Sequence, residues 1–150
     1  MNPEKLFEES YERVIGSGVG MTEKGDAFFT RFYEIFLNSS VKVAEKFANT
    51  DMAGQIKMLQ KAMFQLISFY LLRSSGDYLH EIATSHSKVR HDIDPEFYDL
   101  WLKSLIQTVC ETDPEYTPEL KLAWEIVMSP GILYLKHHYD LQDSHGASPS

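Results

Sequence analysis

Apolar residues recur along this chain at intervals of three and four positions, the period of an amphipathic helix. Sustained alternation of apolar and polar residues, which marks half-buried strands, is absent. The pattern therefore predicts an all-α protein. The helices are expected at about 3–19, 22–37, 41–47, 52–74, 77–89, 95–110 and 117–139.

Residues that favour helix ends mark several of these boundaries. The expected N-caps are Thr22, the run Asn49-Thr50-Asp51, and Asp94 before Pro95, and the last helix is expected to begin at about Thr117. Glycines at positions 16, 18 and 20 are expected to end the first helix, and Pro130-Gly131 predicts a kink in the last one. We expect a single domain over 1–141 and a polar, disordered tail over 142–150.

The second segment carries aromatic side chains in unusual density, in the run AFFTRFYEIFL. A helix with a narrow apolar stripe has no room for all of them on one face. We therefore expect this helix to be deeply buried on more than one side. The whole chain holds 2 Trp, 8 Tyr and 9 Phe, an aromatic share suited to lining a flat group.

Length and charge narrow the class of protein. A chain of 150 residues fits one domain of ordinary size. Fourteen Lys and Arg against 22 Asp and Glu give a net charge of −8, and no basic tract is present. This balance argues against nucleic acid or an anionic membrane as the main partner.

Cysteine usage and the N-terminus indicate a cytoplasmic protein. A single cysteine, Cys110, has no partner for an intrachain disulfide. The N-terminus lacks the apolar region of a secretion signal, and no apolar run approaches the roughly 20 residues of a membrane span.

Common catalytic and metal motifs are missing. The sequence contains no CxxC, HExxH, GxGxxG, GxxxxGK[ST] or GxSxG pattern. His137 and His138 are adjacent, so on a helix they point about 100° apart and are poorly placed to share one metal ion. Zinc binding, dinucleotide binding and serine-hydrolase chemistry therefore have no support.

His86 is a different kind of candidate. It follows Leu79, Ile82 and Ala83 at helical spacing, so its imidazole lies on an apolar face. One interpretation is a core histidine bonded to a carbonyl group. The other is a ligand of haem iron, because a single imidazole in an apolar aromatic cavity holds haem from one side.

In the order of its segments the chain resembles the globins, over about residues 3 to 141. The residues that carry the resemblance are Phe32-Tyr33, Phe47 fourteen positions later, His86, and Pro95 at the start of the next helix. The resemblance is to single-domain bacterial and sensor-type members, and no flavin or NAD domain follows. It implies a globin fold, a 3-over-3 helical sandwich that encloses haem b.

On the distal side, the resemblance implies that Tyr33 donates a hydrogen bond to a bound gas and that Phe47 packs flat on the porphyrin. The alternatives are a tyrosine bonded to a carbonyl group and a phenylalanine in ordinary core packing. A distal glutamine would fall on Gln55, with Leu59 against the haem. A two-residue shift would select Lys57 and Lys61, which we disfavour because a buried Lys61 would lose its solvation.

On the proximal side, the resemblance implies that His86 binds the iron. The residues expected to line this wall are Ile82, Val89, Ile93, Phe97 and Trp101. Arg90 or His91 would meet the haem propionates.

The implied function is reversible binding of O₂, NO or CO by a gas sensor or oxygen-binding protein. A sensor needs a signalling partner or a homodimer, formed through the first and last helices. Two alternatives stay open: an NO dioxygenase that works with a separate reductase, and a haem-free interaction module with a globin fold.

Overall fold

The computed structural model describes residues 2–16, 22–72 and 94–146, and every regular element in these ranges is an α-helix. The helices are α1 (Pro3–Val14), α2 (Glu23–Leu37), α3 (Val41–Lys46), α4 (Met52–Leu72), α6 (Pro95–Thr112) and α7 (Pro118–Gly146). The predicted all-α class is confirmed. None of the helices in these ranges is long and apolar enough to cross a bilayer.

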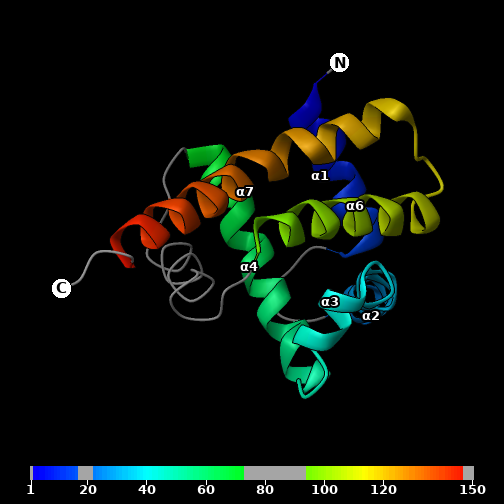
Figure 1. The fold of residues 1–150 in the computed structure, drawn as a ribbon. Coiled ribbons are helices and arrows are strands. Elements are labelled where there is room, and N and C mark those ends of the chain that lie inside the picture. Colours follow the sequence, from blue (N-terminus) through cyan, green and yellow to red (C-terminus); the bar gives the residue numbers. More distant parts are fainter. Residues whose placement is uncertain (1, 17–21, 73–93, 147–150) are drawn as a thin grey trace.

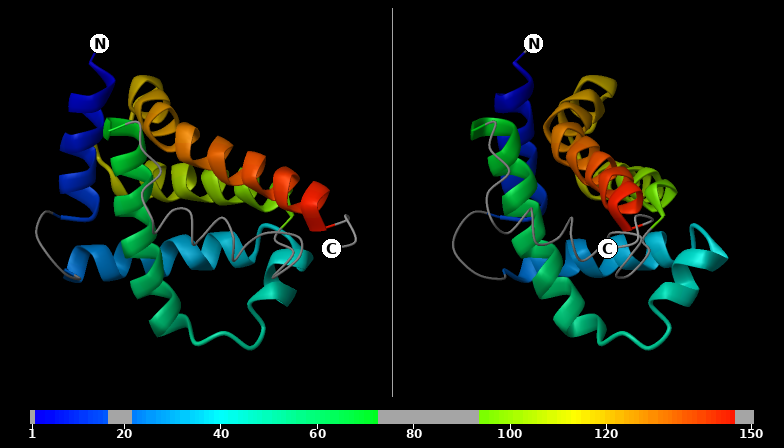
Figure 2. Two further views of the ribbon diagram at one scale, coloured as in Figure 1. Left: turned by 90° about the vertical axis from the view of Figure 1, so that its left-hand side faces the viewer. Right: turned by 60° about the vertical axis from the view of Figure 1, so that its left-hand side comes forward.

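The helices are arranged in two crossing sets. In Figure 2, α1 and α4 run steeply, and α2, α6 and α7 lie across them. The most extensive packing joins α1 and α4 to α7, α2 to α6, and α6 to α7. The short helix α3 lies beside the end of α2 (Figure 1). The helix expected over 77–89 lies outside the described residues.

Capping side chains start the helices where the sequence predicts them. The Thr22 hydroxyl accepts a hydrogen bond from the Gly25 amide at 2.9 Å, and Asp94 accepts from the Glu96 amide at 2.9 Å. Thr117 does the same for α7, at 3.1 Å from the Leu120 amide. Each bond satisfies an amide that has no partner within its helix.

Two predicted helix ends are wrong. The first helix was expected to reach position 19, but α1 ends at Val14, because Gly16 adopts a φ of 96° that leaves the helical region. The last helix was expected to end at Tyr139, but α7 continues to Gly146. The helix therefore extends into the stretch 142–150, for which we expected disorder.

The aromatic helix α2 is buried on several sides, as predicted. Phe28 is 2% exposed, and both Phe29 and Phe32 are fully buried. Phe28 and Phe29 are sequence neighbours and so point about 100° apart, yet neither reaches solvent. Burying such a helix on more than one face contributes roughly 2 kcal/mol for each large apolar side chain.

Helices α4 and α7 approach each other closely at Gly131. A Cβ atom at position 131 would overlap with Cδ2 of Leu66 and would lie 3.6 Å from the Leu66 Cα. Because Gly131 has no side chain, the backbone of α7 packs directly against the Leu66 side chain of α4. Gly131, one of the two residues for which we predicted a kink, therefore serves the packing of these helices.

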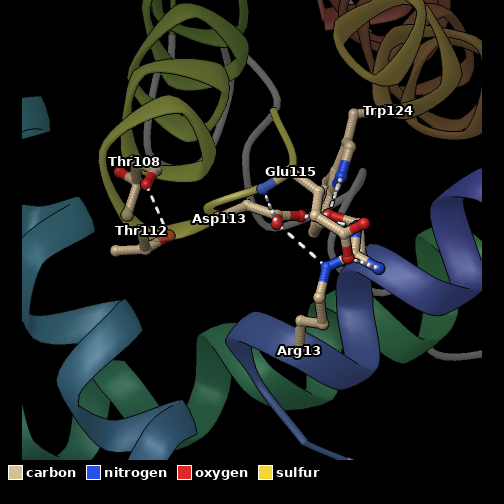
Figure 3. A network of polar contacts seen from close by, with 7 residues as sticks. Arg13, Thr108, Thr112, Asp113, Glu115 and Trp124 are labelled. Carbon is tan, nitrogen blue, oxygen red and sulfur yellow. Dashed lines mark hydrogen bonds and ion pairs between the residues drawn. The ribbon is translucent and has the colours of Figure 1, made fainter. Parts of the chain in front are cut away.

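A buried polar network anchors α1 to the turn between α6 and α7 (Figure 3). The Ser10 hydroxyl donates to Oδ2 of Asp113 at 2.6 Å, and the Trp124 indole donates to Ser10 at 3.0 Å. Arg13 donates to both carboxylate oxygens of Asp113, at 2.9 and 3.0 Å. The network thus joins α1 to the turn and to α7, which are 100 to 114 positions away in the sequence.

The Asp113 side chain is fully buried but is charged. Burial has the largest single effect and raises the pKa of this carboxyl, but the hydrogen bonds from Arg13, Ser10 and the Glu115 amide, with the charge of Arg13, together outweigh it. The pKa of Asp113 therefore lies below its ordinary value of 3.8. The bidentate contact with Arg13 offsets the free-energy cost of removing the carboxylate from water.

Candidate functional site

The polar centre of the candidate site is a pair of side chains from α2 and α4. Tyr33 on α2 is 5% exposed, and its hydroxyl shares a hydrogen bond with the side chain of Gln55 on α4. Burial raises the pKa of Tyr33 to about 12, while the hydrogen bond with Gln55 acts in the opposite direction. The hydroxyl is therefore protonated at neutral pH and available as a donor.

Aromatic rings surround this pair. Phe47 caps the end of α3, and its ring centroid lies 6.0 Å from that of Tyr33 and 5.9 Å from that of Phe36. Both contacts are edge-to-face, the geometry that aromatic rings favour. The turn after α3 therefore brings Phe47 against Tyr33, while its predicted contact with a porphyrin stays a prediction.

Two registers of α4 were considered from the sequence, one with Gln55 and Leu59 facing the site and one with Lys57 and Lys61. Leu59 is 6% exposed and lies one turn after Gln55, whereas Lys57 and Lys61 are both exposed. Because residues four apart share a helix face, Gln55 and Leu59 lie together on the side of α4 that faces the core. The ranking of Gln55 above Lys57 agrees with this burial.

Helix α6 supplies two more of the predicted side chains. Phe97 is 6% exposed, and the partly buried Trp101 meets Phe32 edge-on, with ring centroids 5.8 Å apart. Phe97 also forms part of a cavity of about 280 Å³ between α3 and the start of α6. The lining residues are Lys42, Glu45, Lys46, Asp94 and Phe97.

The proximal residues of the prediction fall in another part of the chain. His86, Ile82, Val89 and Arg90 lie outside the described residues, as do Ile93 and the alternative His91. Their roles stay predictions. Cys110 is exposed on α6, so it takes no part in the candidate site.

The described side chains fit a haem in their chemistry. Apolar walls from α2, α3, α4 and α6 suit a flat macrocycle, and the protonated Tyr33 with Gln55 adds a single polar pair. The network of Ser10, Arg13 and Asp113 was not foreseen. The sequence signal for it is only the serine on the buried face of the first helix, because its partners are distant in sequence.

Together these observations define an all-helical protein with a Tyr–Gln pair beside a cluster of aromatic side chains. The chain is similar to a solved structure of the protein PA3967 from Pseudomonas aeruginosa PAO1, described as structurally highly homologous to a human hemoglobin. The two are 36% identical over 92% of this chain and 98% of the other, with a TM-score of 0.79. No protein-family model and no curated protein sequence matches.

At this identity and coverage, the chain belongs to the globin family. The predicted globin fold is confirmed, since the described helices superpose on that structure over most of the chain.

Proposed function

We propose that this globin binds one haem b through His86 and a diatomic gas, O₂, NO or CO, on the side of Tyr33. The observation that carries the proposal is the hydrogen-bonded pair of the buried Tyr33 and the partly exposed Gln55, beside the aromatic rings of Phe32 and Phe47. Burying the Tyr33 hydroxyl costs free energy unless hydrogen bonds replace those it makes with water. A core needed only for packing would be more stable with a phenylalanine at position 33.

The proposed cofactor contacts come from both sides of the pocket. The haem iron supplies the site at which a diatomic gas binds reversibly. Phe47, Leu59, Phe97 and Trp101 supply apolar walls that exclude water. The remaining proposed contacts are the apolar Ile82 and Val89 and the cationic Arg90 near the propionates.

Tyr33 is proposed to act as a neutral hydrogen-bond donor. With a pKa of about 12, its hydroxyl keeps its proton throughout the physiological range. The hydrogen bond with Gln55 restrains the direction of the hydroxyl, which lowers the entropy lost when it donates to a bound gas. The pair thereby slows escape of the ligand, which suits a cytoplasmic gas sensor or oxygen-binding protein.

Titration of the purified protein with haem tests the proposal. We expect a Soret band at about 400 nm, whose absorbance saturates at one haem per chain. His86→Ala is expected to lose this stoichiometric band, while His137→Ala, at an exposed position on α7, keeps it. A titration without saturable binding would support the haem-free interaction module instead, and unchanged binding in His86→Ala would exclude this histidine as the ligand.

A further inference from the structure

Charged side chains surround the cavity of about 280 Å³ between α3 and the start of α6. Lys42, Glu45 and Lys46 come from α3, whereas Asp94 and Phe97 come from the start of α6. The four charged residues are exposed. The cavity therefore differs from the apolar walls proposed for the haem, although Phe97 belongs to both.

The α3 wall of the cavity is held in place by its cap and by the core. The Ser40 hydroxyl caps the helix and accepts a hydrogen bond from the Lys42 amide at 3.2 Å. Val43 is fully buried, which anchors another face of α3 in the core. Because residues three and four apart share a helix face, α3 presents Lys42, Glu45 and Lys46 together.

The α6 wall places a carboxylate beside an aromatic ring. Oδ1 of Asp94 accepts a hydrogen bond from the Glu96 amide at 2.9 Å, which caps the helix. Because the cap uses Oδ1, Oδ2 is the oxygen that a ligand would meet. The Phe97 amide donates to the Asp94 carbonyl oxygen at 2.8 Å, so the ring follows the carboxylate by about one helical turn. Phe97 is 6% exposed and gives the cavity an apolar floor.

The charges of the cavity favour a ligand that carries both signs. Its walls hold two ammonium groups and two carboxylates. A plain anion would be repelled by Glu45 and Asp94, and a plain cation would be repelled by both lysines. A zwitterion converts these repulsions into attractions, because each of its charges can point to side chains of the opposite sign.

The volume and the floor of the cavity narrow the class of ligand further. A volume of about 280 Å³ lies just below the roughly 300–1,000 Å³ of most ligand pockets, which limits the ligand to a small molecule. An aromatic ring on the ligand would pack against Phe97 in the offset or edge-to-face arrangements that such rings prefer. A small zwitterion with an aromatic ring at one end is a free aromatic amino acid.

We propose that this cavity binds a free aromatic α-amino acid. The carboxylate of the ligand accepts hydrogen bonds from Lys42 and Lys46. Its ammonium group donates to Asp94 and Glu45, and its ring lies on Phe97. Each exposed ion pair contributes little, so we expect a dissociation constant of about 1 mM. The site is therefore occupied only when the amino acid is abundant.

Saturation-transfer difference NMR with L-phenylalanine tests the proposal, because this method detects weak ligands. We expect saturable binding to the purified protein, with a dissociation constant of about 1 mM. The analogues 3-phenylpropionate, which lacks the ammonium group, and phenethylamine, which lacks the carboxylate, should each bind roughly tenfold more weakly. An analogue that binds as tightly as phenylalanine would overturn recognition of the zwitterion. No saturable binding of phenylalanine up to about 10 mM would overturn the site itself.

Two variants each remove the charge of one wall. Asp94→Asn keeps the helix cap, since asparagine caps helices as well as aspartate does, and Lys42→Gln keeps a polar side chain. Each should weaken binding of phenylalanine by about fivefold. Asp94→Asn should also strengthen binding of 3-phenylpropionate, and Lys42→Gln should strengthen binding of phenethylamine, because one repelling charge is gone.

Lys24→Gln and Asp26→Asn are the matched controls, at exposed positions near the start of α2. They make the same changes in charge outside the cavity, so all three affinities should stay unchanged. Equal weakening in the controls would show that the net charge of the protein, rather than the cavity, attracts the ligand. Unchanged binding of phenylalanine in both Lys42→Gln and Asp94→Asn would overturn the cavity as its site.

Discussion

The hydroxyl of Tyr33 is the group on which the proposed ligand chemistry depends. Replacing it in Tyr33→Phe removes a buried donor and leaves the ring in place against Phe47. A hydrogen bond of this kind contributes about 1–2 kcal/mol, so we expect O₂ to dissociate about five to thirty times faster. Stopped-flow displacement of O₂ by CO measures this rate.

A second buried tyrosine provides the control. The Tyr11 hydroxyl is buried without a hydrogen-bond partner among the described residues, and its ring lies against Trp124 far along the chain. Tyr11→Phe should leave O₂ dissociation unchanged. Equal rates of O₂ dissociation in Tyr33→Phe and the unaltered protein would show that Tyr33 does not donate to the bound gas. Loss of NO turnover in Tyr33→Phe, measured with a reductase present, would instead favour an enzyme.

Asp113 makes stability depend on pH. Its pKa is lowered in the folded state, so its contribution is present above the ordinary value of 3.8 and is lost as the pH falls through the folded-state pKa. At pH 7, Asp113→Asn should lower the free energy of unfolding by about 3 kcal/mol, because Arg13 and Ser10 lose their charged acceptor. Urea denaturation at neutral and acidic pH checks both statements.

Asp99→Asn is the matched control for this prediction. The Asp99 side chain is 68% exposed and pairs with Lys136, so its loss should cost less than about 1 kcal/mol. The difference between Asp113→Asn and the unaltered protein should shrink at acidic pH. A difference that stays constant down to acidic pH would mean that the buried carboxylate is not the source of the effect.

The sequence predicts a residue's position well when the signal lies within its own helix. The resemblance to globins pointed to Gln55 and Leu59, and the apolar periodicity of α4 favoured this register over Lys57 and Lys61. The contact of Ser10 with Asp113 could not be predicted. It depends on how α1 docks on a turn about a hundred residues away, and neither residue carries a local signal for its partner.

At the scale of elements, Gly131 determines how closely α4 and α7 pack. Gly131→Ala places a methyl group where Leu66 Cδ2 lies, so Leu66 must leave its position in the core. We expect a loss of about 1–2 kcal/mol in the free energy of unfolding, despite the better helix propensity of alanine. Chemical denaturation measures the loss.

Combining Gly131→Ala with Leu66→Ala tests the cause. If the clash dominates, the double variant should lose less than the sum of the two single losses, because the added methyl group fills part of the space vacated by Leu66. Strictly additive losses would show that the two residues do not interact. Gly131→Ala with unchanged stability would show that the helices can separate slightly at no cost.

Helix starts were more predictable than helix ends. A start is encoded by a capping side chain within four residues, as at Thr22 and Asp94, so the sequence reveals it directly. The end of α1 depends on which of three nearby glycines leaves the helical region first, and Gly16 does. The end of α7 lies in a polar stretch with no strong stop signal before Gly146.

At the scale of the molecule, α4 crosses α2 (Figure 2), and the packing of α3 and α4 on α2 brings Phe47 and Gln55 to Tyr33. The order of helices predicted this arrangement only through the resemblance to globins, because periodicity alone does not specify which helices pack. The proximal half of the site, centred on His86, rests on that resemblance still.

Cofactor binding should raise thermal stability. A ligand that binds only the folded chain stabilises it by about 2.7 kcal/mol at one hundred times its dissociation constant. Differential scanning calorimetry with and without stoichiometric haem should therefore show a higher Tm for the loaded protein. His86→Ala should lose most of this increase. An equal increase in both proteins would indicate that haem binds elsewhere.

The most direct test of the central claim is the absorption spectrum of the haem-loaded protein in its ferric, ferrous and CO-bound forms. We predict a Soret band at about 400 nm that shifts on reduction and again on addition of CO. All three spectra should be altered in His86→Ala. Saturable haem binding whose three spectra are identical in His86→Ala would contradict iron ligation by His86. Failure of the protein to retain haem after unbound haem is removed would contradict the account of this globin as a haem protein.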